Sequence, residues 1–140
     1  MIDDIEMLTS ILQSAEIGCQ GIVSVRKRLH AVDSVLCEQL AKYGKLYYCA
    51  SHMLKNRGVE IRHVSPFTKA MTRYAAERDL RRDSSASHVA EMMIKGNTMG
   101  VNKMTRNIRT YDGKDPHVIK LARRMLDTED ENIGEMKVFL

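Results

Sequence analysis

DPHVIKLARRMLDTEDENIGEMKVF, residues 115–139, is the stretch that decides the fold, because it predicts one amphipathic helix with a marked beginning. Asp115 is a typical N-cap residue, and Pro116 suits the first helical position, where its missing N–H would be unpaired anyway. The residues of one face then follow one another at steps of three and four, as expected for an amphipathic helix. That face comprises Val118, Ala122, Met125, Glu129, Asn132, Met136 and Phe139.

Three further segments, 2–30, 33–58 and 84–111, have apolar stripes with the same period. The second begins at Asp33, a predicted cap, and ends at a Gly that follows basic residues, a typical helix stop. Only a few residues separate the first segment from the second, and the third from the fourth. Each pair should therefore pack as an antiparallel hairpin.

Residues 59–83 differ from these four segments, because a polar connection through Ser65 and Pro66 leads into a short amphipathic helix. We expect this stretch to be a long crossover between the second and third long helices. Residues 1–140 are thus predicted to form one all-α domain, an antiparallel four-helix bundle with a crossover that carries a short helix. The short helix sets Phe67, Met71, Tyr74 and Ala75 against Lys69, Arg73, Arg78, Arg81 and Arg82.

The cysteine pattern and the start of the chain bear on location. Cys19, Cys37 and Cys49 are odd in number and follow no zinc-binding spacing, which favours a reducing cytoplasm. The first residues lack the features of a signal peptide, and no stretch approaches the roughly 18 apolar residues of a membrane span. A cytoplasmic protein without membrane contacts is expected.

The net charge of +4 is small and spread along the chain. A basic surface can bind phosphates, and residues 69–82 are the most basic stretch. Glu77, Asp79 and Asp83 interrupt that stretch, however. We therefore expect a solvated helix and no nucleic-acid partner.

A polar layer at mid-height of the bundle is the only chemical feature that the sequence predicts. Its residues lie near the middle of their segments, where antiparallel helices meet at the same height. Burying a carboxylate costs several kcal/mol unless it is paired, protonated or bound to metal. The layer is a hydrogen-bonded network that fixes helix register, or a metal or small-ligand site. The third alternative is that the helix register differs and the groups are exposed. It comprises Glu16, Tyr43, Tyr47, Asn97, Glu129 and Asn132.

These residues resemble the ferritin-like superfamily, which includes rubrerythrins and bacterioferritins, and especially its small bacterial members of unknown function. The resemblance spans nearly the whole chain and rests on residues 12–16, 95–97 (KGN) and 126–133 (LDTEDENI). It implies a di-iron centre built from one Glu on each of two helices and a Glu-x-x-His pair on each of the other two.

The sequence departs from that ligand set on three helices. Glu16 stands where the first-helix Glu is expected, and Glu129 begins the last pair. Asn97 replaces the third-helix Glu, and Asn132 replaces the His of the last pair. The resemblance therefore implies a degenerate site, in which Glu16 and Glu129 are left to bind a divalent metal weakly.

The register of the second helix stays open. One alignment puts Gly44 and Tyr47 at its ligand positions, and another puts Cys49 and His52 there. His52 is expected to point away from the core. The one Glu-x-x-His sequence, residues 60–63, lies in the crossover and is interpreted as a chance occurrence.

We therefore expect a non-catalytic protein that acts through binding, structure or self-association and needs no cofactor. The expected partner is a second copy, in a dimer, or another protein. The dimer would bury a methionine-rich surface of the third long helix, made of Met92, Met93, Met99 and Met104. Two alternatives are a metal-binding or redox protein that uses Glu16 and Glu129, and a nucleic-acid-associated protein that uses residues 69–82.

Overall fold

The computed structural model describes residues 1–26 and 32–140, and the predicted all-α class is confirmed in this part of the chain. The end of the first predicted segment, residues 27–30, lies outside the described residues. The five helices there are α1 (Asp4–Arg26), α2 (Asp33–Asn56), α3 (Pro66–Arg82), α4 (Ala86–Arg109) and α5 (Pro116–Lys137).

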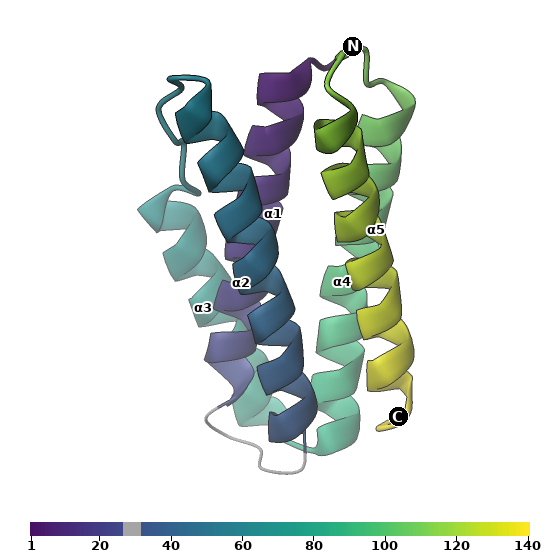
Figure 1. Cartoon of the computed structure of the whole chain (residues 1–140). Coiled ribbons are helices and arrows are strands. Elements are labelled where there is room, and N and C mark those ends of the chain that lie inside the picture. The colour runs from purple at the N-terminus through teal and green to yellow at the C-terminus, as the bar shows by residue number, and fades with distance from the viewer. Residues whose placement is uncertain (27–31) are drawn as a thin grey trace.

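The helices lie side by side, with the N-terminus at one end of the molecule and the C-terminus at the other (Figure 1). α1 and α2 run antiparallel, as do α4 and α5. Between the two hairpins, α3 carries the chain back along the molecule, so α2 and α4 run in the same direction (Figure 1). α1 contacts all four other helices, and α2 also contacts α5.

Of the two predicted caps, Asp115 is confirmed and Asp33 is not. The Asp115 carboxylate accepts a hydrogen bond from the His117 N–H at 2.9 Å, which confirms the predicted start of α5. Ser65 and Ser85 cap α3 and α4 in the same way. The prediction for α2 was wrong by one residue: Val32 is the N-cap, without a side-chain bond, and Asp33 is the first helical residue.

The core is built almost entirely by α1, α2, α4 and α5, and Leu80 is the only buried residue of α3. The apolar residues predicted for α3 are not on the side that packs. Phe67 and Tyr74 are 74% and 60% exposed, because α3 rests on α1 through its opposite side. The predicted short helix is 17 residues long.

The expected methionine-rich surface on α4 is largely core. Met104 is buried, and Met92 and Met93 pack against the buried residues. Only Met99 is mostly exposed, at 67%. The four methionines therefore lie on different sides of α4 and do not form one surface.

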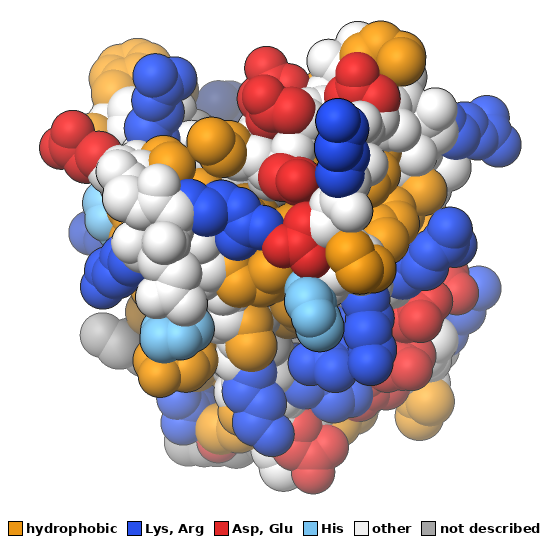
Figure 2. Space-filling model, turned by 45° about the horizontal axis from the view of Figure 1, so that its top comes forward, with side chains coloured by type: hydrophobic (Ala, Val, Ile, Leu, Met, Phe, Trp, Pro, Cys, Tyr) orange, Lys and Arg blue, Asp and Glu red, His pale blue; other side chains and the backbone are white. Residues whose placement is uncertain are grey.

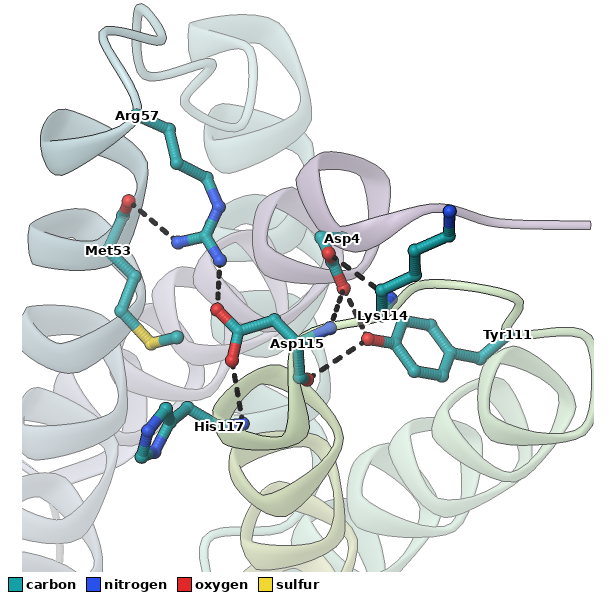
Figure 3. A network of polar contacts seen from close by, with 7 residues as sticks. All are labelled: Asp4, Met53, Arg57, Tyr111, Lys114, Asp115 and His117. Atoms are coloured by element: carbon teal, nitrogen blue, oxygen red, sulfur yellow. Dashed lines mark hydrogen bonds and ion pairs between the residues drawn. The ribbon is translucent and has the colours of Figure 1, made fainter.

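A network of polar contacts ties α1, α2 and the α4–α5 connection together at one end of the bundle (Figure 3). The Tyr111 hydroxyl donates to the Asp4 carboxylate and lies 3.3 Å from the Asp115 backbone oxygen. Arg57, just after α2, pairs with the Asp115 carboxylate that caps α5. Partial burial and the Asp4 bond raise the pKa of Tyr111 to about 12. These contacts fix the relative height of the two hairpins.

The outer surface mixes charges of both signs with separate apolar areas over the face drawn in Figure 2. Within residues 1–26 and 32–140, none of the helices combines the length and the apolar composition that a membrane crossing requires.

Candidate functional site

The Tyr43 hydroxyl is the centre of a buried cluster that joins three helices. It reaches from α2 to Asn97 on α4 and to Glu129 and Asn132 on α5. Its oxygen lies 2.9 Å from Asn97 Oδ1 and 2.8 Å from Glu129 Oε2, and Asn132 Nδ2 donates to it at 3.2 Å. All four side chains are at least 96% buried. We call these residues the central cluster.

The number of hydrogens in the central cluster identifies the protonation state that fits it. A phenol has one hydrogen, so Tyr43 can donate to Asn97 or to Glu129 but not to both. All three contacts are satisfied if Glu129 is protonated and donates to Tyr43, while Tyr43 donates to Asn97. If Glu129 were charged, Tyr43 would donate to it, and the Asn97 amide would have to turn its Nδ2 toward the phenol. The orientation in which Asn97 turns its Oδ1 toward the phenol therefore fits a neutral Glu129.

The surroundings of Glu129 favour the same neutral form. Burial raises the pKa of its carboxyl to about 7, although the hydrogen bond from Tyr43 acts in the opposite direction. Burial and the nearby Glu129 charge also raise the pKa of Tyr43 above its ordinary value. The central cluster can therefore take up a proton near neutral pH, and Tyr43 stays an un-ionised phenol.

Two glycines make room for the central cluster. A Cβ atom at Gly18 of α1 would lie 2.6 Å from Tyr43 Cζ, and one at Gly100 of α4 would lie 2.8 Å from the Glu129 carboxyl carbon. Real Cβ atoms do not approach other atoms so closely, so both positions need glycine. Gly96, one turn before Gly100 on α4, has open space around it and makes no such room.

Two polar atoms of the central cluster remain without a hydrogen-bond partner among the described residues. These are Asn97 Nδ2 and Asn132 Oδ1. The side-chain nitrogen and oxygen of Gln39 on α2 also have no hydrogen-bond partner. Buried amides without partners are costly. The cluster is thus a polar layer that is only partly satisfied, and it is held in place by the packing around it.

Glu16 lies in a second cluster at the surface, between α1 and α3. One carboxylate oxygen is 2.9 Å from His63 Nδ1, and the other is 2.9 Å from Lys69 Nζ. An open cavity of about 390 Å³ adjoins it, and Tyr47 lines this cavity with its ring stacked on that of His63. Burial and the Glu16 charge raise the pKa of the Cys19 thiol, which makes it a poor nucleophile. We call Glu16, His63 and Lys69 the surface cluster.

The six residues predicted as one polar layer thus divide between two clusters. Tyr43, Asn97, Glu129 and Asn132 meet in the central cluster, while Glu16 and Tyr47 belong to the surroundings of the surface cluster. The two predicted metal ligands, Glu16 and Glu129, have no hydrogen-bond partner in common.

The structure also settles which second-helix residue faces the centre. Tyr43 reaches it, Gly44 and His52 are exposed, and His52 points outward as predicted. His63 was missed as a functional residue, since its Glu-x-x-His spacing with Glu60 was read as chance. Glu60 is indeed exposed, and His63 instead contacts Glu16, which is 47 positions away. No local pattern could reveal that contact.

The di-iron centre implied by the ferritin-like resemblance does not fit these residues. Among residues 1–26 and 32–140, no three His, Cys, Asp or Glu side chains are grouped closely enough to hold a metal ion. Glu129 is surrounded by a phenol and two amides, which cannot balance two metal charges. Glu16 is already neutralised by the Lys69 ammonium, which would repel a cation.

The fold and the two clusters define an all-α helical protein with a buried polar centre. Comparison of the chain with protein-family models, curated proteins and solved structures found no match.

Proposed function

We propose that the chain is a ferritin-like four-helix bundle that acts as a non-catalytic binding protein. The order and direction of the helices support this proposal: two antiparallel hairpins are joined by a long connection, which makes α2 and α4 run the same way (Figure 1). A long second connection of this kind is a property of ferritin-like bundles, and simple up-and-down bundles lack it.

The observation that carries the non-catalytic part is the composition of the central cluster. Ferritin-like oxidases place carboxylates and imidazoles at this level of the bundle. Here the same level has one carboxyl group, Glu129, with Tyr43, Asn97 and Asn132 as its partners. Phenol and amide groups form hydrogen bonds that specify which helices pair and at which height. In this proposal the central cluster therefore fixes which helices pair and at which height.

Metal analysis of protein purified without chelator tests the proposal. We expect much less than one iron, manganese or zinc ion per chain, and the same low content in Glu129→Gln and Glu16→Gln variants. Stoichiometric metal that disappears in Glu129→Gln would instead establish the alternative, a metal-binding or redox protein. Metal lost only in Glu16→Gln would point to the surface cluster as its site.

Self-association through α4 methionines has little surface to use, because Met99 alone is mostly exposed. On α3, by contrast, the exposed side chains Phe67, Met71 and Tyr74 follow one another at steps of four and three residues. We therefore propose α3 as the binding surface.

A further inference from the structure

The exposed face of α3 differs in composition from the side that packs on α1. Every charged side chain that is exposed on this helix is an arginine. Lys69, Glu77 and Asp79 are half-buried, and Lys69 is held by Glu16. Asp83, the third acidic residue of the basic stretch, is exposed just after the end of α3. At about 100° per residue, one exposed face of α3 comprises Phe67, Met71, Tyr74, Arg78, Arg81 and Arg82.

The apolar part of this face has the geometry of a helix-pairing seam. Phe67, Met71 and Tyr74 follow one another at steps of four and three residues and are 74%, 51% and 60% exposed. Side chains at this spacing form one stripe that can insert between the side chains of a facing helix. A large aromatic side chain buries on the order of 150–250 Å² when fully covered, so these three partly exposed side chains together offer roughly 300–400 Å², the area of a small functional patch.

We propose that the exposed face of α3 docks an acidic amphipathic helix of another protein, an inference that rests on the proposed binding function. Phe, Tyr, Met and Arg are the residue types enriched in protein interfaces, whereas Lys, Glu and Asp are depleted there. Apolar residues of the partner helix would pack on the stripe, and its carboxylates would pair with the arginines that follow the stripe, which bind carboxylates in a bidentate manner.

A second copy of the chain is a poor occupant of this face. Two α3 faces would bring arginines against arginines, and like charges oppose such pairing. The acidic residues on α5, Asp127, Asp130 and Glu131, have no exposed apolar residue beside them on that helix that could cover the α3 stripe. Charge and apolar pattern therefore point to a different protein.

A nucleic acid fits the same face less well. Proteins that bind single strands use a basic groove that follows the backbone, with aromatic rings as stacking surfaces. On α3 the aromatic rings flank Met71 in a helical stripe, and most of the arginines follow toward the end of the helix. An apolar stripe with charges at one end matches an amphipathic helix better than a repeating phosphate backbone.

Fluorescence anisotropy with the full chain and a designed peptide tests the proposal. The probe is a labelled helical peptide with leucines at steps of four and three residues and glutamates beside them. We expect saturable binding that weakens as salt is raised. A Phe67→Ser, Met71→Ser, Tyr74→Ser variant should bind about tenfold more weakly or worse, as expected when hot-spot residues are removed.

Two controls isolate the α3 face. A Tyr48→Ser, Met99→Ser variant removes two equally exposed side chains from other helices, each 67% exposed, and should bind the peptide as the unchanged chain does. A peptide of the same composition in scrambled order should not bind. Circular dichroism melts should show that both variants fold, because all substituted side chains are exposed.

Several results would overturn the proposal. These are equal binding of the scrambled peptide, unchanged binding by the α3 variant, and tighter binding of a uridine 20-mer through the same residues. A concentration-dependent dimer in light scattering that the α3 variant abolishes would assign the face to a second copy. Absence of peptide binding together with absence of metal would reject only this inference, whereas stoichiometric metal would reject the proposed function whatever the titration shows.

Discussion

Two glutamates of the same bundle are stabilised in opposite ways. Glu129 lies in the centre, where only a phenol and amides surround it, and burial raises the pKa of its carboxyl to about 7. Glu16 lies at the edge, where a Lys ammonium and a His ring each contact one of its oxygens. The first carboxyl group avoids a buried charge by holding its proton, and the second is charged and paired.

The difference teaches that helical position alone does not define a carboxylate's role. Both residues occupy mid-helix positions near an apolar stripe, yet α3 reaches only one of them with a cation. A buried acid without a cation resists ionisation, whereas Glu16, whose side chain is 8% exposed, has a cation and an imidazole within 2.9 Å. Predictions about the two clusters should therefore differ in size and in their response to pH and salt.

Removing the Tyr43 side chain should have the largest effect. Tyr43→Ala deletes a large buried ring and leaves Glu129 and Asn97 without their shared partner, so we expect a loss of about 4 kcal/mol in the free energy of unfolding. Urea unfolding followed by circular dichroism would measure it. Tyr48→Ala on the same helix is the matched control and should change stability by less than about 0.5 kcal/mol, because Tyr48 is exposed.

Stability should fall as the pH rises through neutrality, because Glu129 must lose its proton in the folded protein. Its ordinary pKa of 4.5 is raised to about 7, so the folded state binds more protons than the unfolded state between these values. The contribution of Glu129 to the free energy of unfolding is therefore largest below about pH 4.5. It declines by up to roughly 3 kcal/mol by pH 8.

Glu129→Gln should remove most of this decline, since an amide does not titrate. Urea unfolding at a series of pH values from 5 to 8 would compare the two proteins. Glu38→Gln, which changes an exposed glutamate of α2, serves as the matched substitution and should leave the slope in place. An equal slope in Glu129→Gln and the unchanged chain would show that Glu129 does not carry the effect.

Periodicity and caps predicted the long helices well, because both depend on residues close together in the sequence. The Asp115–Pro116 start and the central positions of Asn97, Glu129 and Asn132 were found in this way. The 3.6-residue repeat is enough to place a side chain on the inner face of a helix. It is not enough to say which side chains from other helices it will meet.

The rest depended on contacts between distant segments. The pairing of His63 with Glu16 follows from how the crossover folds back on α1, which no local pattern encodes. The outward position of Phe67 and Tyr74 follows from the choice between two possible packing sides of α3, and apolar composition favoured the wrong one. Gly18 is explained only by the Tyr43 ring that covers it.

Gly18→Ala should destabilise the protein by about 2 kcal/mol. The new methyl group would lie 2.6 Å from the Tyr43 ring, and the cost of overpacking exceeds the gain of up to about 1 kcal/mol in helix propensity. Gly21→Ala on the same helix has open space around it and should stabilise the protein by up to about 1 kcal/mol. Thermal melts of the two variants should shift in opposite directions, and shifts in the same direction would contradict the packing of Tyr43 on α1.

The smallest effect is expected in the surface cluster. Lys69→Met keeps the apolar stem but removes one charge that pairs with Glu16, whose second partner, His63, remains. Because the Lys69 side chain is 38% exposed and water can take its place, we expect a loss of about 1 kcal/mol. Because Lys69 joins α3 to α1, the loss should show mainly as faster hydrogen exchange of α3 amides, with little change in global unfolding. High salt should remove the difference between the variant and the unchanged chain, since it screens the pair.

Lys42→Met is the matched control and should leave the hydrogen exchange of α3 amides unchanged. The Lys42 ammonium lies 3.7 Å and 3.8 Å from the carboxylates of Glu131 and Glu135. A large loss of global stability in Lys69→Met would mean that the surface cluster supports the bundle as much as the central cluster does.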